Sequence, residues 1–243
     1  MLERGVDSII NEALATGTFG KDFKFRTGQR EVIEAICNHY IEDPQGTIIL
    51  DAPTGSGKSL IAMWSAHVLK ELGKRGYLVT SDLMLQDQYE EDFKRLKLNW
   101  PSIRGVDNYN CNVNDLPFSL ADCKMKGIGY EAAEKLPCWG TCGYLQGRKR
   151  AKELPVALFN YSYYLIQRNY VEDKMQEQDR EIPFPQRDFV FFDEAHKVDN
   201  IVQSHFSPRI DRTTTKIFKE VNKFVQKQAI SACLLYTSDA ADE

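Results

Sequence analysis

The stretch "DAPTGSGKS" (51–59) decides the fold prediction for this chain. A short β-branched run, "GTIIL" (46–50), precedes it and is expected to form a strand, and an amphipathic helical pattern begins near Lys58. Glycine at positions 55 and 57 lets backbone N–H groups face one anion, and the N-terminus of the helix adds partial positive charge. A strand, a glycine-rich loop and a helix in this order therefore predict a phosphate-binding loop.

The side chains of this loop suit a nucleotide that carries Mg²⁺. Lys58 is expected to reach the β- and γ-phosphates, and Ser59 is expected to place its hydroxyl on the metal ion. Ala52 stands where the usual pattern has glycine. The alternative is a Gly/Ser-rich loop that merely precedes a helix. The candidate ATP-binding residues of the loop are Ala52, Pro53, Thr54, Gly55, Ser56, Gly57, Lys58 and Ser59.

A second stretch with candidate catalytic residues is "FVFFDEAHKVDN" (189–200). Its apolar run predicts a central parallel strand that is buried on both faces. Ligands bind at the carboxyl ends of such strands, and an NTPase needs one carboxylate for Mg²⁺ and usually another for the attacking water. Asp193 is therefore expected to hold Mg²⁺ opposite Ser59, and Glu194 is expected to act on the water. The alternative is a strand that stops at an acidic turn.

Strands and helices alternate along most of the chain. Further strands are expected at 76–80 and 156–160, and a further helix is expected at 83–96. This alternation predicts an α/β fold in which a parallel sheet is covered by helices on both faces. Residues 100–150 break the rhythm and are interpreted as an insertion. Residues 170–187 are interpreted as a charged surface loop, and residues 213–228 as a helix.

The composition is that of an ordinary globular protein, with 243 residues, of which 42% are hydrophobic and 27% charged. No apolar run approaches the roughly 20 residues that a membrane helix needs. The N-terminus lacks the pattern of a signal peptide, so we expect a cytoplasmic protein with no membrane partner. The net charge is −4, so any contact with nucleic acid must be local.

Four cysteines fall within the predicted insertion, at the spacing C-x11-C-x14-C-x3-C. In a reducing compartment such a group favours a metal site over disulfides. Thiolates suit either Zn²⁺ or an iron–sulfur cluster, and the spacing alone does not choose between them or exclude free thiols. Cys37 lies in an apolar helical pattern and is expected to be buried. The candidate metal ligands are Cys111, Cys123, Cys138 and Cys142.

Together, "APTGSGKS" and "DEAH" resemble the motor domain of superfamily 2 helicases, whose phosphate loops often begin with alanine. The resemblance implies a RecA-like P-loop motor fold and ATP hydrolysis. "FRTGQREVI" (25–33) resembles the segment that contacts adenine in this group, which implies a contact from Gln29, with Phe25 or Arg26 beside the base. In these helicases the residue at His196 links the nucleotide site to a second motor domain and to the DNA track.

The candidates for contact with nucleic acid come from three segments. "VTSDLMLQDQ" (79–88) resembles the helicase motif that contacts the backbone of single-stranded DNA, and "FNYSYYL" (159–165) resembles a segment near the same strand. A basic run follows the last cysteine of the insertion and suits phosphates. The alternative is ordinary packing, or a solvated helix face for the basic run. These candidates are Thr80, Gln86, Arg148, Lys149, Arg150 and Asn160.

The position of the insertion, between the phosphate loop and "DEAH", resembles the XPD/DinG branch of these helicases. In that branch the insertion carries a [4Fe–4S] cluster. Family members often group the later three cysteines more tightly than this chain does, so zinc and free thiols remain the alternatives.

The leading hypothesis is an ATP-dependent helicase or translocase that moves 5′ to 3′ on single-stranded or forked DNA. We expect a RecA-like domain at 1–99 and 151–210, the cysteine insertion at 100–150, and the start of a helical region at 211–232. A second RecA-like domain is expected to be missing from this chain. The last eleven residues, "CLLYTSDAADE" (233–243), resemble the translation of a sequencing-library adapter, so we expect the natural sequence to depart from this one near Ala232.

Two other functions remain open. One is a P-loop ATPase that remodels nucleic acid without unwinding it, or that is coupled to a nuclease. The other is a DNA-binding module whose metal site senses redox state.

Overall fold

The computed structural model describes residues 5–128, 130–168 and 184–206. The chain divides into two compact units, Met1–Val202 and Gln203–Glu243. The second unit is described only at the end of one helix, so the fold below is that of the first. The predicted helix at 213–228 and the suspected adapter segment at 233–243 lie outside the described residues, as does most of the predicted loop at 170–187.

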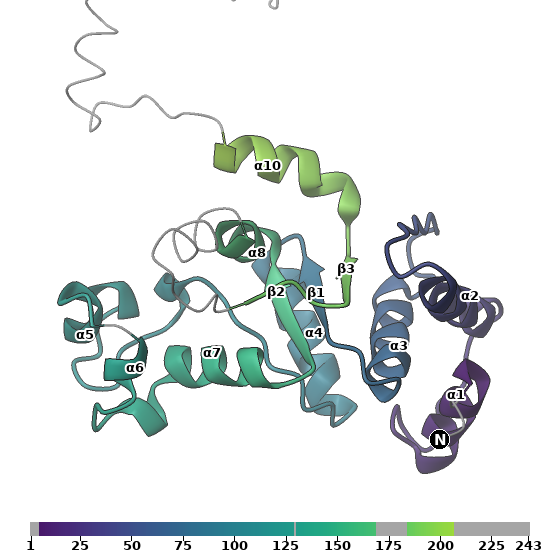
Figure 1. Ribbon diagram of the computed structural model, residues 1–243, viewed down its shortest axis with the longest axis horizontal. Helices are drawn as coiled ribbons and strands as arrows, with labels where there is room; N and C mark the ends of the chain where they lie inside the picture. Colours follow the sequence, from purple (N-terminus) through teal and green to yellow (C-terminus); the bar gives the residue numbers. More distant parts are fainter. Residues whose placement is uncertain (1–4, 129, 169–183, 207–243) are drawn as a thin grey trace, which may run out of the picture. The chain divides into compact units, whose positions relative to one another are not determined.

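Three parallel strands form the sheet (Figure 1). They are β1 (Gly76–Thr80), β2 (Val156–Asn160) and β3 (Phe189–Phe192), in the order β2-β1-β3. The register places Gly76 opposite both Val156 and Phe189. β1 and β2 are buried along their whole length, as continuous apolar strands of a parallel sheet should be. The sequence-based prediction of an α/β fold with a parallel sheet is confirmed, but the predicted central, fully buried strand at 189–192 is wrong, because β3 lies at the edge of the described sheet and Phe192 is 46% exposed.

Helices cover both faces of this sheet. Alternate residues of β1 face opposite sides, so Leu78 packs with α1 to α4 while Tyr77 and Val79 pack with α7, α8 and the insertion. Trp64 of α3 is fully buried on the side of the sheet that Leu78 faces, and its ring stacks on Phe19. The main helices are α1 (Val6–Thr16), α2 (Gln29–Glu42), α3 (Lys58–Glu71), α4 (Leu83–Arg95), α7 (Gly143–Glu153), α8 (Tyr161–Ile166) and α10 (Val198–Phe206).

The predicted strand at 46–50 is wrong for this structure. The segment pairs with no strand among the described residues, and the side chain of Ile49 is 89% exposed. β-Branched residues favour a strand only where a neighbouring strand and a packing surface receive them. Here β3 pairs with β1 along one edge, and the segment that leads into the phosphate loop is exposed and has no regular secondary structure.

The predicted insertion consists of short elements that pack on the sheet. Its start lies against β2, because Leu158 donates its N–H to the carbonyl of Pro101 and accepts from the N–H of Ile103. The last helix, α7, continues beyond residue 150 to Glu153. The short elements before it are η1 (Val106–Asn108), η2 (Phe118–Leu120), α5 (Asp122–Met125), α6 (Tyr130–Ala133) and η3 (Trp139–Thr141).

Within the described ranges, no helix combines the length and the apolar composition that crossing a membrane would require.

Candidate functional site

The phosphate loop lies between the exposed 46–50 segment and α3. Gly55 and Gly57 have φ angles of +80° and +85°, in the left-handed region that favours glycine, and Gly57 is the N-cap of α3. The ammonium group of Lys58 folds back over the loop and donates to the carbonyls of Ala52 at 2.8 Å and Pro53 at 3.3 Å. The loop thus holds its lysine beside the helix N-terminus, where an anionic phosphate would be attracted.

The two chemical motifs meet in space although they are far apart in sequence. Ser59, in the first turn of α3, donates its hydroxyl to Oδ2 of Asp193 at 2.9 Å, across 134 residues of sequence. Asp193 directly follows β3, and its own N–H continues the ladder by donating to the carbonyl of Val79. A hydroxyl and a carboxylate, both oxygen donors, therefore face each other at the carboxyl end of the sheet, where parallel sheets bind ligands.

Two tyrosines that the sequence analysis did not assign to the nucleotide site also hold Asp193. Tyr89 of α4 donates its hydroxyl to Oδ2 at 2.8 Å, and Tyr161 of α8 donates to the main-chain carbonyl of Asp193 at 3.0 Å. Burial, followed by the charge of Asp193, holds the pKa of both hydroxyls above the ordinary tyrosine value. Both hydroxyls therefore stay protonated and act as donors. No motif marks Tyr89, and Tyr161 lies in the segment 159–165 that was predicted to lie near single-stranded DNA, not at the nucleotide site.

Glu194 adopts an unusual backbone conformation beside this carboxylate. Its φ is +58°, which is uncommon for a residue other than glycine. Its N–H donates to Oδ1 of Asp193 at 3.0 Å, and its carboxylate lies 3.4 Å from Nε2 of His196. The side chain of His196 is 71% exposed. The turn thus separates the two acids, with Asp193 directed toward Ser59 and Glu194 paired with the exposed histidine.

The predicted adenine-contact residues are tied to the phosphate loop. Gln29 donates its amide to the carbonyl of Ser56 at 2.8 Å, and Arg26 donates to the carbonyl of Gly55 at 2.6 Å. A Cβ at position 57 would lie 2.6 Å from the Gln29 amide nitrogen, so a side chain there would displace this amide from the loop. Phe25 packs against Trp64 with its ring centroid 4.9 Å away. The structure therefore brings this segment to the loop, with Phe25 partly used for packing.

These residues fit a magnesium nucleotide. The hydroxyl oxygen of Ser56 is buried in the phosphate loop and has no hydrogen-bond partner among the described residues. A buried polar atom without a partner is costly unless a ligand or water satisfies it. Together with the Ser59–Asp193 pair and the lysine beside them, it indicates a loop shaped for phosphate oxygens.

Three of the candidates for nucleic-acid contact are buried in this structure, and their assignment as contact side chains stays a prediction. Gln86 is 0% exposed and donates to Ser102 Oγ at 2.7 Å and to the carbonyl of Ile103 at 3.0 Å, while its oxygen accepts from Asn160. Asn160 in turn caps α8 by accepting from the N–H of Tyr163. Thr80 is also 0% exposed. Gln86 and Asn160 bond to each other and to other parts of the chain, so these two side chains hold α4, β2 and α8 together, whereas the Thr80 hydroxyl donates locally to the carbonyl of Asp82 at 3.3 Å.

Replacing Gln86 with alanine should therefore destabilise the fold. The change removes three hydrogen bonds and leaves the Asn160 amide and the Ile103 carbonyl buried without this partner, which costs about 2–3 kcal/mol. Urea denaturation measures the loss. Gln88→Ala is the matched control, because Gln88 is an exposed glutamine on the same helix and should change stability by less than about 0.5 kcal/mol. Equal stability of the two variants would contradict the internal role of Gln86.

The basic run lies on α7 at the surface, where some of its side chains contact other parts of the chain. Arg150 is exposed and donates to Asn99 at 2.6 Å, and Lys149 is half-buried. The guanidinium of Arg148 lies 5.9 Å from the ring centroid of Phe184. These contacts neither assign nor exclude a role toward phosphates, so the predicted contacts stay predictions.

The four cysteines of the insertion lie close enough to act electrostatically on one another. Burial first, then the thiols of Cys111 and Cys138, raise the pKa of Cys123. Burial also raises the pKa of Cys142 against the effect of the N–H groups of Leu145 and Tyr144, while the thiols of Cys138 and Cys123 add to the rise. All four side chains contribute thiols, the donors that soft metals prefer. Nevertheless, in the part of the chain that the structure describes, no group of three or more His, Cys, Asp or Glu side chains is arranged to hold a metal ion.

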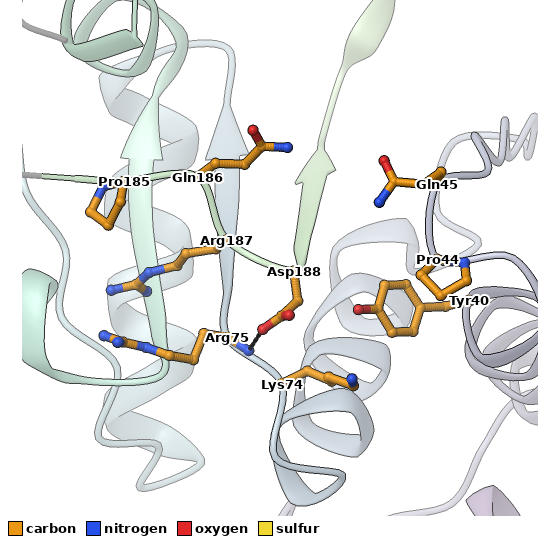
Figure 2. Close-up of a pocket in the computed structure, with 9 residues that line it drawn as sticks. All are labelled: Tyr40, Pro44, Gln45, Lys74, Arg75, Pro185, Gln186, Arg187 and Asp188. Carbon is orange, nitrogen blue, oxygen red and sulfur yellow. Dashed lines mark hydrogen bonds between the residues drawn. The ribbon is translucent and has the colours of Figure 1, made fainter. Parts of the chain in front are cut away.

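A pocket of about 440 Å³ lies at the amino ends of β1 and β3 (Figure 2). The backbone N–H of Arg75 donates to Asp188 at 2.7 Å there. The guanidinium groups of Arg75 and Arg187 turn toward β2 and donate to main-chain carbonyls, including that of Lys152. Because these charges satisfy backbone groups, we interpret them as joining the ends of β1 and β3 to the segment before β2.

The fold and the joined motifs define a P-loop ATPase motor domain with the RecA-like architecture of superfamily 2 helicases. The chain belongs to the family described as Type III restriction enzyme, res subunit, which matches residues 22–233. A search of curated proteins found no match. Membership implies a helicase-like, ATP-dependent motor that acts on nucleic acid, and it implies ATP and Mg²⁺ as the ligands of the site.

Proposed function

We propose that this chain provides the first motor domain of a nucleic-acid helicase or translocase that binds Mg–ATP between its phosphate loop and the end of β3. The observation that carries the proposal is the 2.9 Å hydrogen bond between Ser59 and Asp193. It joins two motifs whose separate functions are to bind phosphate and to hold Mg²⁺.

Each polar group of the site has a part in this chemistry. Lys58 would leave the carbonyls of Ala52 and Pro53 for the phosphates, and the loop N–H groups would hold the same anion. Ser59 and Asp193 would hold Mg²⁺, which neutralises charge on the phosphate oxygens. Glu194 would orient the attacking water. His196 is exposed and lies beside Glu194. It would connect the Glu194 carboxylate to a partner that docks on this surface.

A second motor domain is part of the proposal. Phosphoryl transfer in such motors is accelerated by an arginine that stabilises the transition-state charge. Arg26 is the arginine that the structure places against the phosphate loop, and its guanidinium donates to the Gly55 carbonyl. We propose that the stabilising arginine comes from a second RecA-like domain, so this chain alone should hydrolyse ATP poorly.

The finer subtype rests on the sequence resemblance and on the cysteines. We propose an XPD/DinG-like enzyme that moves 5′ to 3′ on single-stranded DNA, with a [4Fe–4S] cluster held by Cys111, Cys123, Cys138 and Cys142. The choice of ligands rests on the grouping of these four cysteines within one insertion. Closing the four thiols around a cluster requires them to adopt a tighter arrangement than the one described here. Zinc is the alternative metal.

The family's description favours a second candidate function. A restriction-enzyme subunit is part of a nuclease, so the motor could move nucleic acid for cleavage rather than separate its strands. The same ATP site serves both functions.

Hydrolysis and unwinding assays test these proposals. The 243-residue chain should hydrolyse Mg–ATP slowly and gain little from single-stranded DNA. The protein joined to a second motor domain should gain a large, DNA-dependent rate. Strand displacement by the joined protein supports a helicase, whereas ATP-driven movement without displacement supports the restriction-type translocase. Full DNA-stimulated turnover by this chain alone would contradict the need for a second domain.

A further inference from the structure

Asp193 accepts hydrogen bonds from several donors at its side chain and at its main-chain carbonyl. Oδ2 accepts from both Ser59 at 2.9 Å and Tyr89 at 2.8 Å, and Oδ1 accepts from the N–H of Glu194 at 3.0 Å. The main-chain carbonyl of the same residue accepts from Tyr161 at 3.0 Å. Two tyrosines from different helices thus fix one acidic residue at the end of β3.

Both tyrosine rings are fixed by packing before any ligand binds. Tyr89 is 1% exposed, and its ring meets Phe93 edge to face at a centroid distance of 6.0 Å. Tyr161 is fully buried and stacks on Phe192, with ring planes 6° apart and centroids 5.7 Å apart. Their hydroxyl groups therefore occupy set positions, which is what an orienting group needs.

The serine and the tyrosine differ in what happens when Mg–ATP arrives. Ser59 is itself a candidate metal ligand, and a hydroxyl can bind Mg²⁺ through its oxygen while its proton still donates to Asp193. Tyr89 has no such ligand role and serves Oδ2 as a hydrogen-bond donor alone. Partners of this kind orient ligating carboxylates, and their loss commonly lowers metal affinity.

We propose that Tyr89 is a positioning residue that holds the Asp193 carboxylate ready for Mg²⁺, and that Tyr161 supports it by fixing the main chain at the end of β3. This inference rests on the proposed function, because it assumes that Asp193 serves the metal of a bound nucleotide. It adds two residues, from α4 and α8, to the structure that prepares the site. Neither residue is expected to contact ATP.

Tyr89→Phe tests the proposal, because it removes the hydroxyl and keeps the packed ring. The probe is a fluorescent derivative of a non-hydrolysable ATP analogue, titrated into the 243-residue chain at fixed Mg²⁺ concentrations and in excess EDTA. Tyr89→Phe should raise the Mg²⁺ concentration needed for half-maximal tight binding by about ten-fold. Affinity in EDTA should stay as in the wild type. Tyr161→Phe should shift the Mg²⁺ requirement in the same direction and by less.

Tyr163→Phe is the matched control. Tyr163 is also a buried tyrosine of α8, and its hydroxyl lies beside Tyr144 rather than Asp193. It should leave the Mg²⁺ requirement unchanged. Thermal melting of all variants separates misfolding from a local effect, and Tyr161→Phe keeps the test open if Tyr89→Phe does not fold.

The outcomes distinguish the positioning role of the tyrosines from the proposed function on which it rests. If Asp193→Asn removes the Mg²⁺ dependence while Tyr89→Phe and Tyr161→Phe retain the wild-type requirement, the positioning role is wrong and the nucleotide site stands. If Tyr89→Phe weakens binding equally with Mg²⁺ and with EDTA, the hydroxyl has only a structural role. If Asp193→Asn itself changes nothing, the proposed function fails first.

Discussion

Lys58→Ala should weaken binding of Mg–ATP by roughly a hundredfold or more. In the structure the Lys58 ammonium lies within the phosphate loop, beside the N-terminus of α3. Truncating one partner of a desolvated, hydrogen-bonded charge pair costs about 2–5 kcal/mol, and each 1.4 kcal/mol is a factor of about ten in affinity. Titration of a fluorescent ATP analogue with Mg²⁺ present measures the change directly.

Lys70→Ala provides the control for this substitution. Lys70 lies in the last turn of the same helix and pairs with Glu71 on the surface. Its removal deletes an equal charge from α3 without touching the loop, so nucleotide affinity should stay within about two-fold, as expected for a surface pair. Equal affinities of the two variants would show that ATP does not bind at this loop.

Loss of a single cysteine of the insertion should remove the metal entirely. If the proposed cluster forms, protein purified without oxygen should contain iron and acid-labile sulfide and absorb visible light. Cys142→Ala should abolish both signals, because a cubane cluster needs its four thiolate ligands. It should also lower the melting temperature, since metal binding contributes to folding.

Cys37→Ala is the matched control for the cysteine experiment. Cys37 is fully buried in α2, away from the insertion, and burial raises the pKa of its thiol to about 12. Its replacement should leave the metal content unchanged. Stoichiometric zinc in the anaerobic wild type would replace the iron–sulfur proposal, and the absence of both metals would leave free thiols. DNA affinity that follows oxidation and survives Lys58→Ala would instead support a redox-sensing binding module.

The nucleotide site could be predicted from sequence because its main parts are local patterns. "DAPTGSGKS" specifies a loop and a helix start within nine residues, and Asp193 follows directly from an apolar run. Parallel strands bring their carboxyl ends to one edge, so the pairing of Ser59 with Asp193 followed from topology without any side-chain detail. The structure supports these predictions by placing the two side chains in contact.

Predictions that depended on long-range packing were less successful. The β-branched run at 46–50 has strand propensity but lacks a paired neighbour in this structure, and propensity alone does not supply one. Gln86 and Asn160 lie in segments that resemble the DNA-contacting segments of helicases, and this resemblance suggested contact with nucleic acid. The structure shows that they satisfy each other and the backbone inside the fold. Polarity identifies a hydrogen-bonding group without identifying its partner.

Tyr89 and Tyr161 show that sequence can also miss a contact that the fold creates. Both lie among apolar residues at positions where packing explains an aromatic ring. Only their hydroxyl contacts with Asp193 distinguish them from other core tyrosines such as Tyr163. Such contacts join α4, α8 and the end of β3, three elements that are distant in sequence.

The most direct test of the account is the Mg²⁺ dependence of nucleotide binding by this chain and by its Asp193→Asn variant. The wild type should bind the fluorescent ATP analogue at least about ten-fold more tightly with Mg²⁺ than with EDTA, because Ser59 and Asp193 would hold the metal. Asp193→Asn should lose that difference and keep its weaker, metal-independent affinity. An unchanged Mg²⁺ dependence in the variant would contradict the assignment of the site.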